Sequence, residues 1–93
     1  MGGMSYRNII GREVAKIRYR RGLSQSGLAR ELQLEGWDIS RSEVSKIEMR
    51  IREVKDWQMM FLVRVLNAPY EAFYPKFDPD ERLYDVLSRV IEF

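Results

Sequence analysis

The sequence predicts an all-α protein with five short helices and a sixth helix at the C-terminal end. Three observations support this prediction. Apolar residues recur at spacings of three and four, capping residues precede the apolar runs, and no segment alternates apolar and polar residues for long. With 93 residues, of which 45% are hydrophobic, the chain has room for one domain with one modest core.

Two helices are expected in the first third of the chain. Asn8 is the expected cap of the first helix, Gly22 ends it in the left-handed conformation, and its inward positions are Ile10, Val14 and Ile17. Ser24 is the expected cap of the second helix, whose inward positions are Leu28, Ala29 and Leu32. Gly27 weakens this second helix, since glycine in a helix interior costs roughly 1 kcal/mol relative to alanine.

The third helix has the most complete start signal. Ser40 is its expected N-cap, Glu43 follows three residues later to close a capping box, and Ile39 and Val44 have the spacing of a hydrophobic staple. Because these local signals agree, Glu43 is assigned to the helix terminus and not to catalysis.

Three more helices follow. Asp56 is expected to cap the most apolar segment, residues 57–66, and Asn67 to end it in the left-handed conformation. Pro69 begins a short helix, and the acidic segment 78–81 begins the last one. That last helix carries an apolar stripe of Leu83, Val86, Leu87, Val90 and Ile91. The expected organisation is a disordered start at 1–7, a domain at 8–75 and a C-terminal helical segment at 76–93.

The composition argues against several classes of function. The chain has no Cys, which excludes disulfides and thiolate chemistry. It also has no His, the usual metal ligand and the usual general base. The carboxylates are scattered, so we expect no enzyme activity, no metal and no cofactor. No apolar run approaches the ~20 residues that span a bilayer, and no signal peptide is recognisable, so a cytoplasmic location is expected.

The charge is unevenly distributed along the chain. Residues 1–55 hold 12 Lys and Arg against 7 Asp and Glu, whereas residues 56–93 hold 4 against 7. A basic half joined to a mildly acidic half suggests that one face meets a polyanion. The third helix fits this suggestion, because a solvated face usually mixes acids with bases and this one has no carboxylate. It consists of Arg41, Ser42, Ser45, Lys46 and Met49.

The segments IRYRRGLSQSGLARELQL and ISRSEVSKIE resemble the XRE family of Cro-type helix-turn-helix DNA-binding domains, to which phage repressors belong. The resemblance covers about residues 9–75 and has Val44 in the place of the family's Ile. The matching positions are Arg18, Gly22, Leu23, Ser24, Gln25, Leu28, Ala29, Leu32, Ser40, Ser45, Ile47 and Glu48. It implies a five-helix lambda-repressor-like domain with an additional C-terminal helix.

The resemblance also implies roles for individual residues. The third helix would lie in the major groove while the second crosses the DNA backbone. Base contacts are expected from Arg41, Ser42, Ser45, Lys46 and Met49. Phosphate contacts are expected from Ser24, Gln25, Arg50, Arg52 and Lys55, although the last three also fit a solvated basic loop. The family commonly pairs the positions of Arg18 and Glu48, which are expected to form a structural ion pair.

Three departures from the family pattern affect these expectations. The turn from Gln33 to Ile39 has seven residues, where about 3–4 are usual. Within it Gly36 makes the bend, and Trp37 either folds onto the edge of the core or touches DNA. Gly27 replaces the usual acidic capping residue, and Arg50 stands where a Gly often ends the third helix.

The expected function is that of a sequence-specific transcriptional regulator, a repressor, in a bacterial or phage setting at the nucleoid. It would bind a palindromic double-stranded operator as a homodimer, with the C-terminal stripe pairing two subunits or packing on its own core. Two alternatives stay open. One is the antitoxin of a toxin–antitoxin pair, which would bind a protein partner through the C-terminal helix. The other is a protein-interaction module that keeps the fold without binding DNA.

Overall fold

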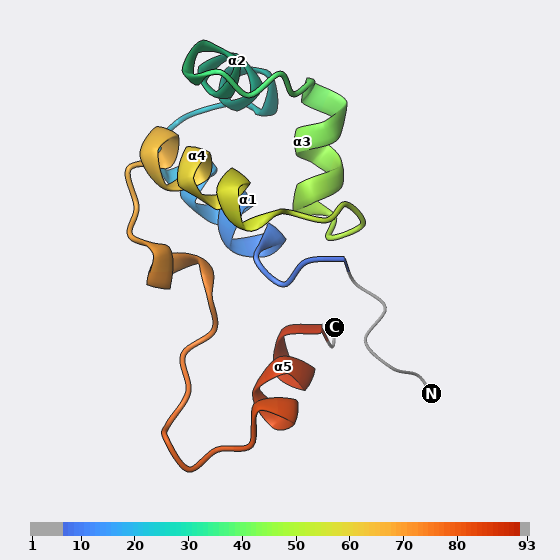
Figure 1. Cartoon of the computed structure of the whole chain (residues 1–93), viewed down its shortest axis with the longest axis vertical. Helices are drawn as coiled ribbons and strands as arrows, with labels where there is room; N and C mark the ends of the chain where they lie inside the picture. The colour runs from blue at the N-terminus through green and yellow to red at the C-terminus, as the bar shows by residue number, and fades with distance from the viewer. Residues whose placement is uncertain (1–6, 92–93) are drawn as a thin grey trace.

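The computed structural model describes residues 7–91, which form helices and no strands, so the all-α prediction is confirmed (Figure 1). The elements are α1 (Gly11–Arg20), α2 (Gln25–Glu35), α3 (Arg41–Glu48), α4 (Asp56–Leu66), the 3-10 helix η1 (Tyr70–Phe73) and α5 (Leu83–Ile91). The predicted disordered start lies outside the described residues except for Arg7, whose N–H donates to the carbonyl of Arg50 at 3.0 Å.

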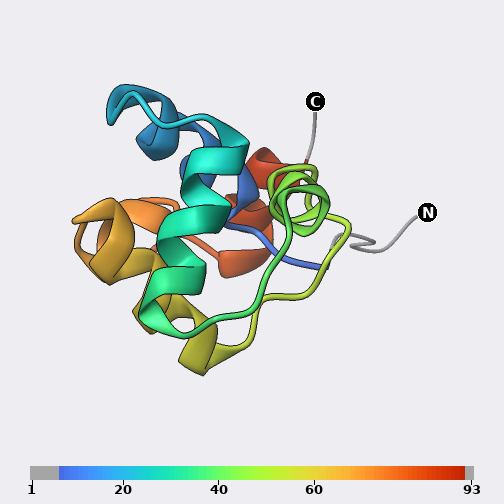
Figure 2. The same ribbon diagram turned by 90° about the horizontal axis from the view of Figure 1, so that it is seen from above.

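The core lies between α1, α2, α3 and α4, and Figure 2 shows α2 and α3 side by side with α1 behind them. The largest fully buried side chains come from these four helices, from the turn before α3, from η1 and from α5: Val14, Leu28, Leu32, Ile39, Val44, Ile47, Leu62, Leu66, Phe73 and Val86. These positions follow the predicted spacings of three and four, because only one face of each helix meets the core. Every helix within residues 7–91 is too short or too polar to cross a membrane.

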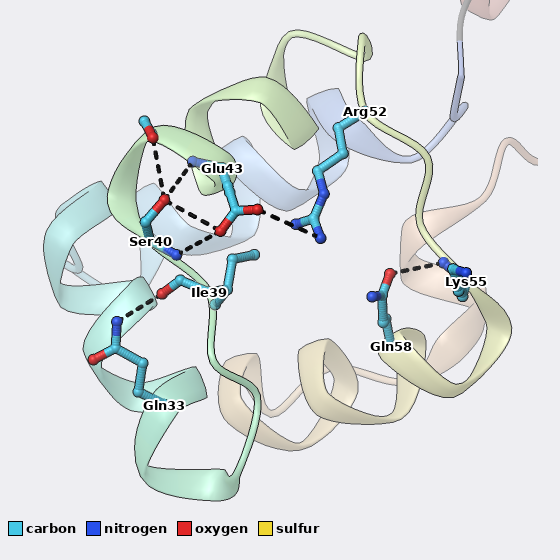
Figure 3. A network of polar contacts seen from close by, with 8 residues as sticks. Gln33, Ile39, Ser40, Glu43, Arg52, Lys55 and Gln58 are labelled. Atoms are coloured by element: carbon cyan, nitrogen blue, oxygen red, sulfur yellow. Dashed lines mark hydrogen bonds and ion pairs between the residues drawn. The ribbon is translucent and has the colours of Figure 1, made fainter.

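The turn between α2 and α3 is shorter than predicted. α2 continues to Glu35, and Gly36 ends it in the left-handed conformation with φ 113°. The turn therefore comprises residues 36–40, and the predicted seven-residue turn is wrong because its first three residues are helical. The amide Nε2 of Gln33 donates to the carbonyl of Ile39 at 2.6 Å across this turn (Figure 3). Trp37 is only 5% exposed and packs near Phe61, with ring centroids 5.8 Å apart, which supports its assignment to the core.

Two helix starts differ from the prediction by one or two residues. α1 begins at Gly11, with Asn8 accepting from the N–H groups of Ile10 (3.0 Å) and Gly11 (2.8 Å), so Asn8 caps from outside the N-cap position. Asp56 is the first residue of α4 and not its cap. The N–H of Lys55 there donates to the side chain of Gln58 at 2.9 Å.

The last helix packs on its own chain. α5 begins at Leu83, after the acidic segment that was predicted to start it, and Val86 is only 1% exposed. Val90 and Ile91 are half-buried, whereas Leu83 stays 56% exposed. The predicted stripe is therefore divided. Val86 packs on its own chain, which is one of the two placements that the sequence left open for the stripe.

Candidate nucleic-acid interface

The outer face of α3, formed by Arg41, Ser42, Ser45, Lys46 and Met49, lies at the edge of the molecule. Figures 1 and 2 both place α3 at this edge, with the other helices of the core on its inner side. Four of the five side chains are exposed and Ser45 is half-buried. Since α3 repeats every 3.6 residues, the inward positions of Val44 and Ile47 lie opposite this face. The structure thus brings together all five residues that were expected to contact bases.

The first of the two carboxylates on α3 is engaged at the start of the helix. Glu43 accepts from the N–H of Ser40 at 3.0 Å, and the hydroxyl of Ser40 accepts from the N–H of Glu43 at 3.2 Å (Figure 3). This is the predicted capping box. The hydrogen bond from the N–H of Ser40 holds the pKa of the Glu43 carboxyl below its ordinary value, and Arg52 contributes in the same direction.

The second carboxylate, that of Glu48, is turned into the domain. It accepts from Nε of Arg18 at 2.6 Å, from Nη2 of Arg18 at 3.0 Å and from the amide Nε2 of Gln25 at 2.9 Å. The side chain of Glu48 is 7% exposed and that of Arg18 is 14% exposed. The two hydrogen bonds from one guanidinium raise the pKa of Arg18 above its ordinary value. The structure therefore contains the ion pair that the resemblance implied, and Gln25 joins it.

The end of α3 rests on the start of α1 through Asn8 and Gly11, for which no role in supporting α3 was expected from the sequence. The amide Nδ2 of Asn8 donates to the carbonyls of Ile47 (3.2 Å) and Arg52 (2.7 Å). A side chain at Gly11 would collide with the carbonyl of Ile47 and the side chain of Arg50. This close approach requires glycine, and it fixes the angle at which α3 stands on α1.

The residues that were expected to contact phosphate differ in exposure, unlike those on the outer face of α3, which are mostly exposed. Ser24 and Lys55 are exposed, and the hydroxyl of Ser24 accepts from the N–H of Gly27 at 2.9 Å, as its role as an N-cap requires. Gly27 lies in the first turn of α2 and not in its interior, so the expected cost of an interior glycine does not apply. Gln25 is half-buried, and one of its two amide N–H groups is used by Glu48.

The expectation that Arg50 contacts phosphate is wrong, because its side chain is buried in the domain. Arg50 is 6% exposed and donates from Nη1 to the carbonyl of Val90 at 2.6 Å, which joins it to the last turn of α5. Its backbone has φ 65°, the left-handed conformation that glycine usually adopts at a helix end. The N–H groups of Arg50 and Ile51 donate to the carbonyls of Ile47 (2.9 Å) and Lys46 (3.1 Å) and close α3.

The side chain of Arg52 also contacts residues of its own domain. Its guanidinium lies over the Trp37 ring, 5.7 Å from the ring centroid. Its Nη2 is 3.9 Å from the carboxylate of Glu43 (Figure 3). Its Nη1 is buried and has no hydrogen-bond partner. Because the side chain retains only 26% exposure, Arg52 contributes to the packing of the turn before α3 more than to an outward basic surface. The contact of Arg52 with Trp37 could not be predicted from the sequence, because an arginine that stacks on a tryptophan has no fixed spacing from it along the chain.

Comparisons of the chain with models of protein families and with curated proteins found no match.

Proposed function

We propose that this protein is a non-enzymatic, sequence-specific DNA-binding regulator of transcription, a repressor, that places α3 in the major groove. The observation that carries the proposal is that both carboxylates of α3 are engaged in hydrogen bonds within the domain. Glu43 is engaged with Ser40, and Glu48 is engaged with Arg18 and Gln25. The outer face of α3 is therefore left with basic, hydroxyl and thioether groups, which do not repel a polyanion. An α-helix of roughly 10–12 Å diameter fits the major groove, which is about 12 Å wide.

Each side chain on this outer face has a chemically suitable target. Arg41 and Lys46 are long donors that suit the O6 and N7 acceptors of guanine or a phosphate oxygen. Ser42 and Ser45 donate and accept, so they suit base edges and phosphates alike. The exposed thioether of Met49 suits the methyl group of thymine.

The start of α2 and the start of α4 would position the domain on the DNA backbone. α2 begins at Gln25 after a serine cap, and the N–H groups of its first turn favour an anion. The second amide N–H of Gln25 then suits a phosphate, while the first orients the side chain against Glu48. The exposed Lys55, at the N-cap of α4, is the remaining phosphate contact from the expected set.

The proposed target is a palindromic operator bound by two copies of the chain in the cytoplasm. One helix contacts only a few base pairs, which is too short a sequence to define a site in a genome. Two copies related by a two-fold axis double the length of the sequence that is recognised.

The experiment that tests the proposal is selection from a pool of randomised duplexes with the full chain, followed by fluorescence-anisotropy titration of the enriched site. We expect an inverted-repeat sequence to be enriched, with affinity that falls as salt rises. Arg41→Ala should weaken binding to this site by roughly tenfold to a hundredfold. The matched control is Arg82→Ala, which removes an arginine that is 77% exposed beside α5 and should leave the affinity unchanged. A pool that shows no enrichment would contradict the proposal.

A further inference from the structure

A small hollow lies where the start of α1 meets the end of α5 and the segment around η1 (Figure 1). Its volume is about 110 Å³, the space that roughly four water molecules occupy in the liquid. Part of its lining is apolar and comes from three separate parts of the chain: Ile9, Phe73, Pro75 and Val90. We name this site the α1–α5 hollow.

The other lining residues of the α1–α5 hollow are charged and belong to α1: Arg12, Glu13 and Lys16. The carboxylate Oε2 of Glu13 is 3.4 Å from Nζ of Lys16, so these two charges offset each other. Within residues 7–91, no hydrogen bond or ion pair engages the guanidinium of Arg12, which is exposed. The hollow therefore combines an apolar wall with one positive charge in excess, carried by Arg12.

This combination favours a small carboxylate with an apolar tail. A planar guanidinium matches a carboxylate through two parallel N–H···O hydrogen bonds. The single charge of a carboxylate balances the excess charge of the hollow, whereas a phosphate carries up to about two charges and offers no apolar surface to the wall. Small-molecule sites in general are lined mostly by apolar groups, with a few polar groups that fix the orientation of the ligand.

We propose that the α1–α5 hollow is a binding site for a short-chain aliphatic carboxylate. The carboxylate would bind the guanidinium of Arg12, and the aliphatic tail would pack on the half-buried side chains of Ile9, Pro75 and Val90. The proposal goes beyond DNA binding and does not depend on it. None of the lining residues belongs to the outer face of α3 or to the expected phosphate contacts.

Val90 connects the hollow to the end of α3. Its side chain lines the hollow, and its carbonyl accepts from Nη1 of Arg50 at 2.6 Å. A carboxylate that spans the hollow would contact α1 and the last turn of α5 together. Because a ligand stabilises the form of the protein that it binds, the bound carboxylate should hold α5 against the rest of the domain.

Titration of the full chain with butyrate at constant ionic strength, followed by heteronuclear NMR, tests the proposal. We expect saturable shifts of the amide signals beside the hollow, with a Kd of about 1 mM because the ligand is small. Two other probes separate the features of the ligand. Butyramide has the same shape without the charge, and inorganic phosphate has charge without a tail. Each should bind at least roughly tenfold more weakly than butyrate.

Three variants locate the site. Arg12→Gln should weaken butyrate binding by roughly tenfold or more, because the charge-assisted hydrogen bonds are lost. Glu13→Gln removes a like charge and should strengthen it several-fold. Arg20→Gln, which removes an exposed arginine of the same helix outside the hollow, is the matched control and should have no effect. Butyrate should also slow deuterium exchange in α5 of the parent, and the same concentration should slow it less in Arg12→Gln.

Three results would overturn the proposal. One is a titration with butyrate that does not saturate, and another is phosphate or butyramide that binds as tightly as butyrate. The third is an equal loss of affinity in Arg12→Gln and Arg20→Gln, which would mean that basic side chains attract the anion without a defined site. Saturable binding that leaves the exchange of α5 unchanged would contradict the contact with Val90.

Discussion

Glu48 shows how one side chain determines the position of a whole helix. Its carboxylate accepts two hydrogen bonds from Arg18 on α1 and one from Gln25 on α2, although it belongs to the last turn of α3. Arg18 in turn donates from Nη1 to the carbonyl of Leu23 at 2.8 Å. This network joins three helices and the turn between the first two, so the direction of α3 depends on it.

Removal of this carboxylate should therefore cost stability. In Glu48→Ala the mostly buried guanidinium of Arg18 loses its partner, and we expect the free energy of unfolding to fall by about 2–3 kcal/mol. Ser42→Ala, on the outer face of the same helix, should stay within about 0.5 kcal/mol of the parent. Urea denaturation followed by circular dichroism measures both variants. Equal stability of Glu48→Ala and the parent would show that the network does not hold the helices together.

The capping box at the start of α3 should make stability depend on pH. The hydrogen bond from Ser40 lowers the pKa of Glu43 in the folded state, so the unfolded state takes up its proton first as pH falls. The stabilisation is complete above pH ~4.5 and is lost as the pH falls through the folded pKa. We expect the melting temperature of the parent to decline more than that of Glu43→Gln between pH 6 and pH 3. Parallel declines would mean that Glu43 contributes no such dependence.

At the scale of elements, Arg50 links the end of α3 to α5. It adopts the left-handed conformation that ends α3, and its guanidinium reaches the carbonyl of Val90 in α5. A non-glycine residue in this conformation costs roughly 1–2 kcal/mol, so the buried side chain must compensate for a strained backbone. The placement of α5 thus depends on the same residue that closes the proposed recognition helix.

Two substitutions at Arg50 distinguish the effect of the strained backbone on stability from the effect of the side chain. Both Arg50→Gly and Arg50→Ala remove the side chain that reaches α5, but only Arg50→Gly also relieves the backbone strain. We expect Arg50→Ala to be less stable than Arg50→Gly by about 1 kcal/mol. In both variants the amides of α5 should exchange with deuterium faster than in the parent, as measured by mass spectrometry. Unchanged exchange in α5 would contradict its attachment through Arg50.

The elements show which features are predictable from sequence. The ends at Ser24, Ser40 and Asn67 depend on residues within one turn of the helix, and the sequence predicted each of them at the observed position. Arg50 could not be predicted in the same way, because its partner lies 40 residues later in the chain. A basic side chain in a loop looks the same in sequence whether it faces solvent or a distant carbonyl.

Contacts between residues far apart in the chain were also unpredictable for the last helix and for parts of the candidate interface. The sequence predicted that the apolar residues of α5 lie on one face of a helix, but it did not show that Val86 would be buried against its own chain. The outer face of α3 was predictable because helical periodicity alone places its residues together. The involvement of Asn8 and Gly11 was not, since both support α3 through contacts that cross the fold.

At the scale of the whole molecule, α3 and η1 lie on opposite sides (Figures 1 and 2). The charge is divided along the sequence. Residues 1–55, which contain α3, are basic, and residues 56–93, which contain α4, η1 and α5, are mildly acidic. In the proposed complex with DNA, the exposed basic side chains of Arg41 and Lys46 on α3 would attract the duplex before any contact is made.

The most direct test of the account compares Lys46→Ala with Lys55→Ala on the selected DNA site and on a random duplex at matched salt. Lys46 lies on the outer face of α3, and Lys55 is an exposed lysine outside it. If α3 contacts bases, Lys46→Ala should lose about 1–3 kcal/mol on the selected site and lower its preference over random DNA. Lys55→Ala should weaken both duplexes equally and make the salt dependence shallower by about one unit. An unchanged preference in Lys46→Ala would contradict the placement of α3 in the major groove.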